Sequence, residues 1–167
     1  MGVNASRAGG RVQVRRGVRE DVPRIVQILV EAREAAQWST SGMEEVLASH
    51  NRYFLIAEVG EDAVGFVSGR GMGQEAEILN LAVKQANRGQ GIGRTLVEEL
   101  LKILREEGSE TVFLEVRESN TPANAFYRGL GFEEAGRREG YYRQPEEAAV
   151  VMRAKLQRRE VRRVTME

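Results

Sequence analysis

The sequence predicts a single α/β domain in which helices cover both faces of a mixed β-sheet. Strand-like and helix-like runs alternate along the chain, and 167 residues suit one domain that buries most of its surface. The expected order is a strand, two helices, three strands, a helix, a strand, a helix and a final pair of strands. This order supplies one sheet with helices for both of its faces.

Composition separates the domain from two terminal segments. Residues 1–10 are small, polar and rich in glycine, so we expect a disordered extension there. Residues 157–167 are highly charged and are expected to form an exposed tail. The arginines of this tail could contact RNA, but the interleaved Glu160 favours a solvated end. The domain is therefore expected to occupy residues 11–156.

The first part of the domain begins with a strand and a helix. Residues 12–15 alternate like a short strand, and Asp21 with Pro23 is typical of a helix start. Apolar residues then recur at helical spacing. The capping-box spacing of residues 41–44 predicts a second, short helix over 43–49.

The middle of the chain predicts three strands and a long helix. Two β-rich runs, 53–59 and 63–68, are separated by a short turn and indicate a hairpin. A third strand-like run covers 77–83. Residues 91–107 carry apolar side chains at helical spacing, and Gly108 provides a stop signal.

The last part of the domain predicts a strand, a helix and a strand pair. Residues 111–117 alternate strictly, which places Glu115 in the middle of a strand. A helix is expected over 120–127, because a cap residue and a proline open it. Phe132 begins a strand that we expect to pair with 148–156.

Composition excludes several classes of function. Lys+Arg and Asp+Glu both number 25, so no net charge favours nucleic acid or membrane partners. Cysteine is absent, which excludes disulfides and thiolate metal sites. Histidine occurs once, so we expect no histidine-based zinc site and no other bound metal. Apolar runs fall far short of the ~20 residues of a membrane span, and the first residues contain no apolar run typical of a secretion signal. We expect a cytoplasmic protein that uses carboxylates, hydroxyls and backbone groups.

A glycine-rich turn joins the third predicted strand to the long helix. It reads Arg88-Gly89-Gln90-Gly91-Ile92-Gly93. Backbone N–H groups in such a turn can converge on an anion, and the helix dipole adds positive charge there. Glycine-rich turns also serve purely structural bends. Arg94-Thr95 follows Gly93, so the turn fits neither the Rossmann nor the Walker nucleotide motif.

The turn and its preceding strand resemble the acetyl-CoA motif of the GNAT acetyltransferases, Gln/Arg-x-x-Gly-x-Gly/Ala. A second family element follows, Asn120-x-x-Ala123 and then Phe126-Tyr127-x-x-x-Gly131-Phe132. Residues 75–83, 114–120 and 137–142 together are similar to the bacterial ribosomal-protein-alanine N-acetyltransferases, and the resemblance covers residues 12–156. It implies a mixed, mostly antiparallel central sheet flanked by helices on both faces.

The resemblance implies a binding site for acetyl-CoA. The backbone of residues 81–83 would pair with the pantetheine arm, and the glycine-rich turn would hold the pyrophosphate. Asn120 would contact the cofactor or cap its helix. Lys84 and Asn87 depart from the residue types common in the family, but neither departure removes a backbone N–H. The expected cofactor-binding residues are Leu81, Ala82, Val83, Arg88, Gly89, Gln90, Gly91, Ile92, Gly93, Arg94 and Asn120.

Acyl transfer to an amine needs a neutral amine, a polarised carbonyl and a proton for the leaving thiolate. The resemblance implies that Glu115 is the base, acting through water, and that Tyr127 is the acid. Spacing alone equally allows Glu115 to form an ion pair with Arg117 or to face solvent. Tyr127 could instead be a packing residue beside Phe126.

Five residues are candidates for substrate contacts. Tyr141 and Tyr142 lie in a loop that would edge the substrate channel, with an exposed hairpin as the alternative. Trp38 would wall the channel, although a lone tryptophan is often a core residue. Glu75 would attract the substrate amine, or simply face solvent, and Asn80 completes this set. Glu77 could attract the amine in the same way as Glu75.

We therefore expect an acetyl-CoA-dependent N-acetyltransferase in which the acceptor amine attacks the thioester directly. An α-amino group with a pKa near 8 is about one-tenth neutral at pH 7, whereas a lysine is almost entirely charged. An N-terminal acceptor is therefore easier for the base to deprotonate. The resemblance implies that the acceptor is the alanine N-terminus of a small ribosomal-subunit protein. The alternatives are a small-amine or lysine acetyltransferase and a non-catalytic acetyl-CoA-binding module. The protein is expected to be a monomer or weak dimer.

Overall fold

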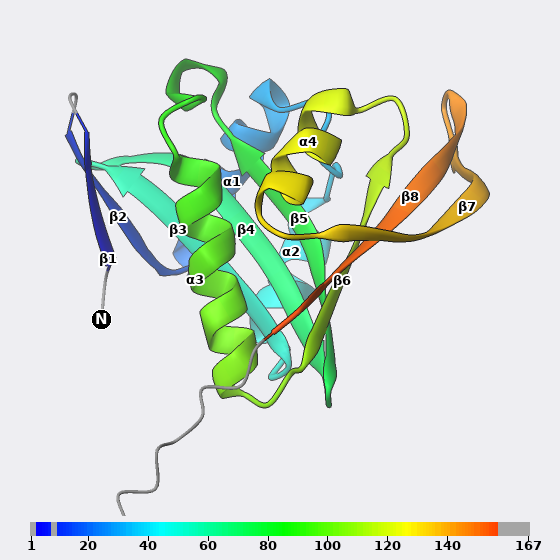
Figure 1. Ribbon diagram of the computed structural model, residues 1–167. Coiled ribbons are helices and arrows are strands. Elements are labelled where there is room, and N and C mark those ends of the chain that lie inside the picture. Colours follow the sequence, from blue (N-terminus) through cyan, green and yellow to red (C-terminus); the bar gives the residue numbers. More distant parts are fainter. Residues whose placement is uncertain (1–2, 8–9, 157–167) are drawn as a thin grey trace, which may run out of the picture.

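The computed structural model describes residues 3–7 and 10–156, which form one eight-stranded sheet with helices on both faces (Figure 1). The strand order is β1-β2-β3-β4-β5-β6-β8-β7, and of these neighbours β5 and β6 alone are parallel. The strands are β1 (Val3–Arg7), β2 (Gly10–Arg16), β3 (Arg52–Val59), β4 (Asp62–Met72), β5 (Glu75–Val83), β6 (Thr111–Arg117), β7 (Glu133–Arg143) and β8 (Glu146–Lys155). The helices are α1 (Val22–Glu31), α2 (Thr40–Ala48), α3 (Ile92–Glu106) and α4 (Thr121–Gly129), with 3-10 turns at Arg19–Asp21 and Gln85–Asn87. The predicted mixed, mostly antiparallel fold class is confirmed.

The N-terminal segment differs from the expected disordered extension over residues 1–10. Val3–Arg7 forms β1, which pairs antiparallel with β2 from Val3 opposite Val14 to Arg7 opposite Gly10. This run lacks a strong apolar pattern, and the edge strand is held by its backbone ladder, which composition does not reveal. The predicted tail, residues 157–167, lies outside the described residues.

Helix α2 begins three residues before the predicted start. Ser39 caps it, because its hydroxyl accepts a hydrogen bond from the Gly42 N–H at 3.1 Å. The sequence spacing had favoured Ser41 as the cap. None of the helices in the described residues is long and apolar enough to cross a membrane.

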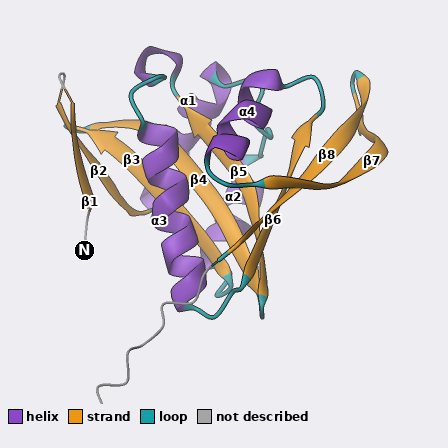
Figure 2. Cartoon of the chain, viewed as in Figure 1, coloured by secondary structure: helices purple, strands orange, loops and turns teal. Residues whose placement is uncertain are grey.

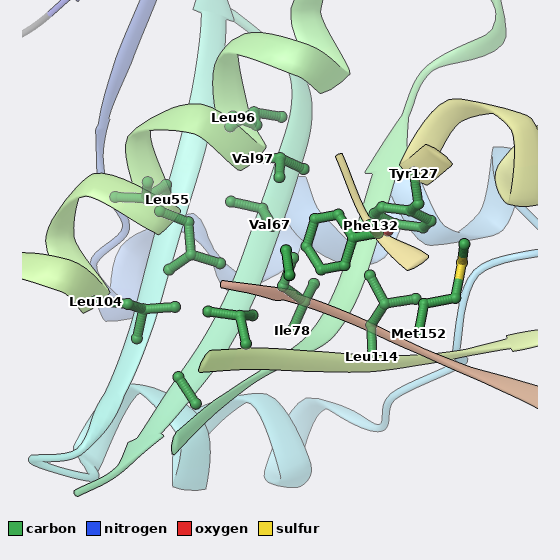
Figure 3. Packing of buried hydrophobic residues seen from close by; sticks show 14 of the residues in the cluster. Leu55, Val67, Ile78, Leu96, Val97, Leu104, Leu114, Tyr127, Phe132 and Met152 are labelled. Carbon is green, nitrogen blue, oxygen red and sulfur yellow. The ribbon is translucent and has the colours of Figure 1, made fainter. Parts of the chain in front are cut away.

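Helices α3 and α4 cover one face of the sheet (Figures 2 and 3). The α3 side chains Leu96, Leu100 and Leu104 are fully buried, as their helical spacing predicts. Beneath α3, Gly69 of β4 leaves room for this close packing. A Cβ there would lie 2.9 Å from both the Leu100 side chain and the Glu77 carbonyl oxygen.

Helices α1 and α2 cover the other face with a second apolar cluster. Ile25 and Ile28 of α1 and Met43 of α2 are buried against the sheet. There the rings of Phe54 and Phe66 stack with centroids 5.2 Å apart. The sheet therefore separates two cores, one for each helix pair.

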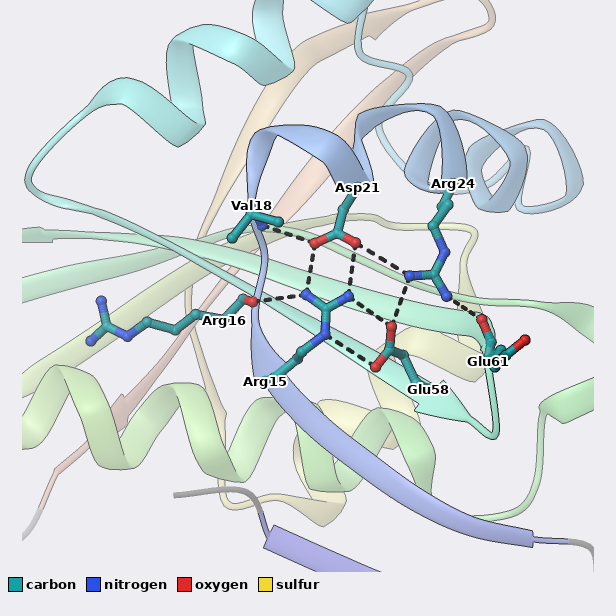
Figure 4. Close-up of polar contacts among 7 residues, drawn as sticks. All are labelled: Arg15, Arg16, Val18, Asp21, Arg24, Glu58 and Glu61. Carbon is teal, nitrogen blue, oxygen red and sulfur yellow. Dashed lines mark hydrogen bonds and ion pairs between the residues drawn. The ribbon is translucent and has the colours of Figure 1, made fainter.

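A four-residue ion-pair network fastens α1 to the sheet (Figure 4). Arg15 of β2 donates two hydrogen bonds of 2.8 Å to Asp21, and it also contacts Glu58 of β3 at 2.7 Å. Arg24 of α1 joins the same carboxylate of Glu58 at 2.8 Å. The hydrogen bond from Arg15 holds the pKa of the buried Asp21 below its usual value.

We expect Asp21→Asn to lower the free energy of unfolding by about 2 kcal/mol at pH 7, because it leaves Arg15 without its principal partner. Urea unfolding would measure this loss. The folded-state pKa of Asp21 is depressed, so its contribution is complete above the unfolded pKa near 4 and is lost as pH falls through the folded value. The two proteins should therefore converge in acid.

The exposed pair between Arg19 and Glu44, at 3.1 Å, offers a matched control. Glu44→Gln should change the unfolding free energy by less than about 1 kcal/mol, because both side chains remain solvated. Equal losses for Glu44→Gln and Asp21→Asn would contradict a special role for the network.

Candidate active site

The sheet opens between its two parallel strands. The register of β5 and β6 covers Glu75–Glu77 opposite Thr111–Phe113, after which β5 continues to Val83 and β6 to Arg117. A cavity of about 1160 Å³ is lined by both strands where they are no longer paired. The segment between α1 and α2, the glycine-rich turn, α4 and the β7–β8 hairpin complete its walls.

Two glycines of the glycine-rich turn adopt the left-handed backbone conformation. Gly89 and Gly91 have φ angles of +74° and +81°, which favour glycine, although a Cβ at either position would meet no other atom of the chain within 4 Å. Glycine is thus required here by backbone conformation, not by crowding within the protein. At Gly93 a Cβ would make an ordinary contact of 3.5 Å with Phe126.

Helix α3 begins without a side-chain cap. Its first intrahelical bond runs from the Thr95 N–H to the Gly91 carbonyl at 3.0 Å, so the N–H groups of residues 92–94 have no acceptor within the helix. No acidic residue lies in the first turn. Gly91, Ile92, Gly93 and Arg94 all line the cavity, so backbone groups and the helix dipole could hold an anion there.

The polar side chains of the turn have partners within the protein. Arg88 donates from Nε to the Val83 carbonyl at 3.0 Å and forms an ion pair with Glu34. Arg94 pairs with Glu98 at 3.1 Å. The predicted cofactor residue Gln90 is absent from the cavity lining, because its amide turns back toward the Ala86 carbonyl at 3.5 Å.

The remaining predicted cofactor residues come together at the cavity. Leu81, Ala82 and Val83 line it from β5. Asn120 lines it as the N-cap of α4, where its Oδ1 accepts a hydrogen bond from the Ala123 N–H at 3.2 Å. Asn120 was expected either to contact the cofactor or to cap its helix, and the structure shows that it caps α4.

Tyr127 combines a packed ring with a place in the cavity wall. The residue is 8% exposed, and its ring makes edge contacts with Phe126 and Phe132 at centroid distances of 5.1 and 5.6 Å. Within residues 3–7 and 10–156 its hydroxyl has no hydrogen-bond partner. Burial raises the pKa of this phenol, so it stays protonated and able to donate at neutral pH.

Glu115 lines the same cavity from the middle of β6. Its carboxylate lies 3.1 Å from Nε of Arg138, a residue of β7. Glu115 does not form the alternative ion pair with Arg117 that the spacing allowed. Arg117 instead contacts Glu147 at 3.3 Å and lies 4.0 Å from the centre of the Tyr142 ring.

Tyr141 and Tyr142 line the cavity from the β7–β8 hairpin, with ring centroids 5.1 Å apart. A hydrogen bond to Glu115 is the main cause that raises the pKa of Tyr141 to about 12. Trp38 lines the opposite wall and also packs against the α1–α2 core. Its two suggested roles, channel wall and core residue, therefore coexist.

The two other substrate candidates have different positions. The buried Asn80 donates from Nδ2 to the Ala36 carbonyl at 2.7 Å, so its amide anchors the segment between α1 and α2. Glu75 is exposed at the paired end of β5 and is absent from the cavity lining. The two strands separate only beyond Glu75. Glu77 lines the cavity instead, in an ion pair with Arg70 of 2.7 Å.

Sequence reasoning missed two contributors. The segment between α1 and α2 supplies Gln37, whose amide donates to the carbonyls of Leu29 and Ala32, and no periodic pattern marked it. Arg138 contacts Glu115 across the sheet. Arg138 lies within the family-like segment 137–142, but only the strand register reveals its partner.

Comparison with known proteins agrees with this geometry. The sequence pattern of the Acetyltransferase (GNAT) family matches residues 22–132. The N-alpha-acetyltransferase RimI of Mycobacterium tuberculosis is 36% identical over 120 residues, which span 70% of this chain and 74% of that protein.

Solved structures share the fold. The ribosomal-protein-S18-alanine N-acetyltransferase of Escherichia coli superposes with a TM-score of 0.79 and 28% identity, covering 90% of this chain and 97% of that one. Arabidopsis thaliana NAA60, solved in complex with acetyl-CoA, superposes with a TM-score of 0.78 at 20% identity, covering 87% and 98%. The chain therefore belongs to the GNAT family of N-acetyltransferases.

Proposed function

We propose that this protein transfers the acetyl group of acetyl-CoA to a protein N-terminal α-amino group. The first candidate acceptor is a ribosomal protein that begins with alanine. One observation carries the proposal: a single cavity joins the uncapped start of α3 to Glu115 and Tyr127 at the split in the sheet.

The residues present fit coenzyme A. Unpaired N–H groups at the start of α3 suit an anionic pyrophosphate. Beyond Glu77 the edge of β5 no longer pairs with β6, so backbone groups near Leu81 can form hydrogen bonds with the amides of the pantetheine arm, while the Val83 carbonyl already accepts from Arg88 Nε. The acetyl-CoA held by the structurally similar Arabidopsis protein supports the same use of this fold.

The proposed chemistry needs two proton transfers. Bound acetyl-CoA supplies an activated thioester, and attack by the neutral amine forms a C–N bond while the C–S bond breaks. Glu115, through water, accepts the proton that the amine loses, and Tyr127 donates a proton to the leaving sulfur. The raised pKa of the buried Tyr127 keeps its proton in place until that step.

An N-terminal acceptor is favoured by two considerations. An α-amino group is partly neutral at pH 7, so a carboxylate base can serve it. The names of the Mycobacterium tuberculosis and Escherichia coli relatives also describe N-terminal acetylation, of S18 in the second case. Trp38, Tyr141 and Tyr142 offer aromatic walls for the first residues of a peptide.

The acceptor can be identified with purified protein, acetyl-CoA and a panel of amines, read by mass spectrometry. We expect a peptide beginning with alanine to gain one acetyl group at its α-amine. The same peptide with a blocked N-terminus and an internal lysine should gain none. Acetylation of small amines alone would contradict the proposed acceptor, and coenzyme A binding without any transfer would indicate a non-catalytic module.

Tyr127→Phe should lower kcat about 100-fold, because the variant keeps the packed ring but has no proton to donate. The Kd for acetyl-CoA, measured by calorimetry, should change less than about twofold. Phe126→Leu is a control in the neighbouring ring and should alter the thermal midpoint more than kcat. An unchanged rate in Tyr127→Phe would exclude the acid role.

Glu115→Gln should reduce kcat/KM for the peptide more at pH 6 than at pH 8. Neutral amine is scarcest at low pH, so loss of the base matters most there. Rates over this range with a fixed, saturating acetyl-CoA concentration test the expectation. A small loss that is uniform across pH would instead indicate a structural role.

A further inference from the structure

Three strands place Arg138 opposite the proposed base. Glu115 of β6 pairs with Val151 of β8, and Val151 pairs in turn with Gly136 of β7. Directly opposed residues share a face of the sheet, as do residues two apart on one strand. Arg138 therefore lies on the same face as Glu115 and reaches it across β8, with Nε 3.1 Å from Oε1.

An irregularity in β7 begins directly after Arg138. Arg138 pairs with Ala149 and Tyr142 pairs with Glu147, so three residues of β7 stand opposite the single residue 148 of β8. Gly140, with a φ of +59°, lies within this bulge. Bulges of this kind redirect side chains beside functional sites.

Tyr141 lies within this bulge, next to Arg138. The guanidinium carbon of Arg138 lies 5.7 Å from the centre of the Tyr141 ring. Arg138 thus contacts both the Glu115 carboxylate and the Tyr141 ring.

The neighbouring arginines are engaged elsewhere. Arg117 lies on the Tyr142 ring and pairs with Glu147. Arg137 pairs with Glu118 at 2.7 Å. Within the part of the chain that the structure describes, Arg138 is therefore the guanidinium that contacts Glu115.

We propose that Arg138 is a positioning residue, which holds the Glu115 carboxylate in the orientation that accepts the proton of the acceptor amine. This inference rests on the proposed function, in which Glu115 is the base. Arg138 is absent from the cavity lining, so it acts through Glu115 and not on the substrates. Its side chain is 60% exposed, and so solvated an ion pair adds little to stability.

Arg138→Gln should lower kcat about tenfold, because an unrestrained base spends less time in the productive orientation. KM for acetyl-CoA and the thermal unfolding midpoint should stay unchanged. Arg138→Lys keeps the positive charge and should recover most of the lost rate. Arg137→Gln removes the adjacent arginine and serves as the matched control, with kcat within about twofold of the parent.

A double-mutant cycle separates positioning from a general structural effect. In the Glu115→Gln background, Arg138→Gln should cost no further rate, because its target is already gone. The same fold loss in both backgrounds would overturn the positioning role while leaving Glu115 as the base. Full activity of Glu115→Gln alone would overturn both this inference and the proposed function.

Discussion

The structure depends on the separation of β5 and β6 after three paired positions. Parallel strands normally continue their ladder, and ending it early leaves the backbone groups on the facing edges of the two strands without partners in the sheet. The apolar core under α3 and α4 nevertheless continues across the split, because it includes Ile78 of β5, Leu114 of β6 and Met152 of β8. Helix α3 lies on β3, β4 and β5, while β6, β8 and β7 form their own antiparallel unit. The gap can then receive a ligand that supplies the missing hydrogen bonds.

Polar anchors fix the segments that surround this gap. The network of Arg15, Asp21 and Glu58 fastens the start of α1 to the sheet, and the Asn80 amide holds the chain beyond α1 against β5. Asn120 caps α4 at the opposite wall. Each anchor satisfies a group that would otherwise be buried without a partner, so these contacts set position more than they add stability.

The two proposed proton-transfer groups, Tyr127 and Glu115, lie in contrasting surroundings. Tyr127 is enclosed by aromatic rings, and this apolar surrounding keeps the phenol in its neutral, donating form. The Glu115 carboxylate instead pairs with the Arg138 guanidinium of β7. A single cavity thus contains a buried neutral acid and a restrained carboxylate, an arrangement that suits simultaneous donation and acceptance of protons.

The sequence by itself determined the order of elements from β2 to β8, the long α3 with its glycine-rich start, and the mid-strand place of Glu115, since all of these follow from local periodicity and turn chemistry. It missed β1 and gave Gln90 and Glu75 roles in a cavity whose lining includes neither residue. Only the tertiary structure decided where β5 and β6 part, that Asn80 anchors a loop, and that Arg138 reaches Glu115. These facts depend on pairing between residues distant along the chain, and such registers are set by packing of the whole sheet.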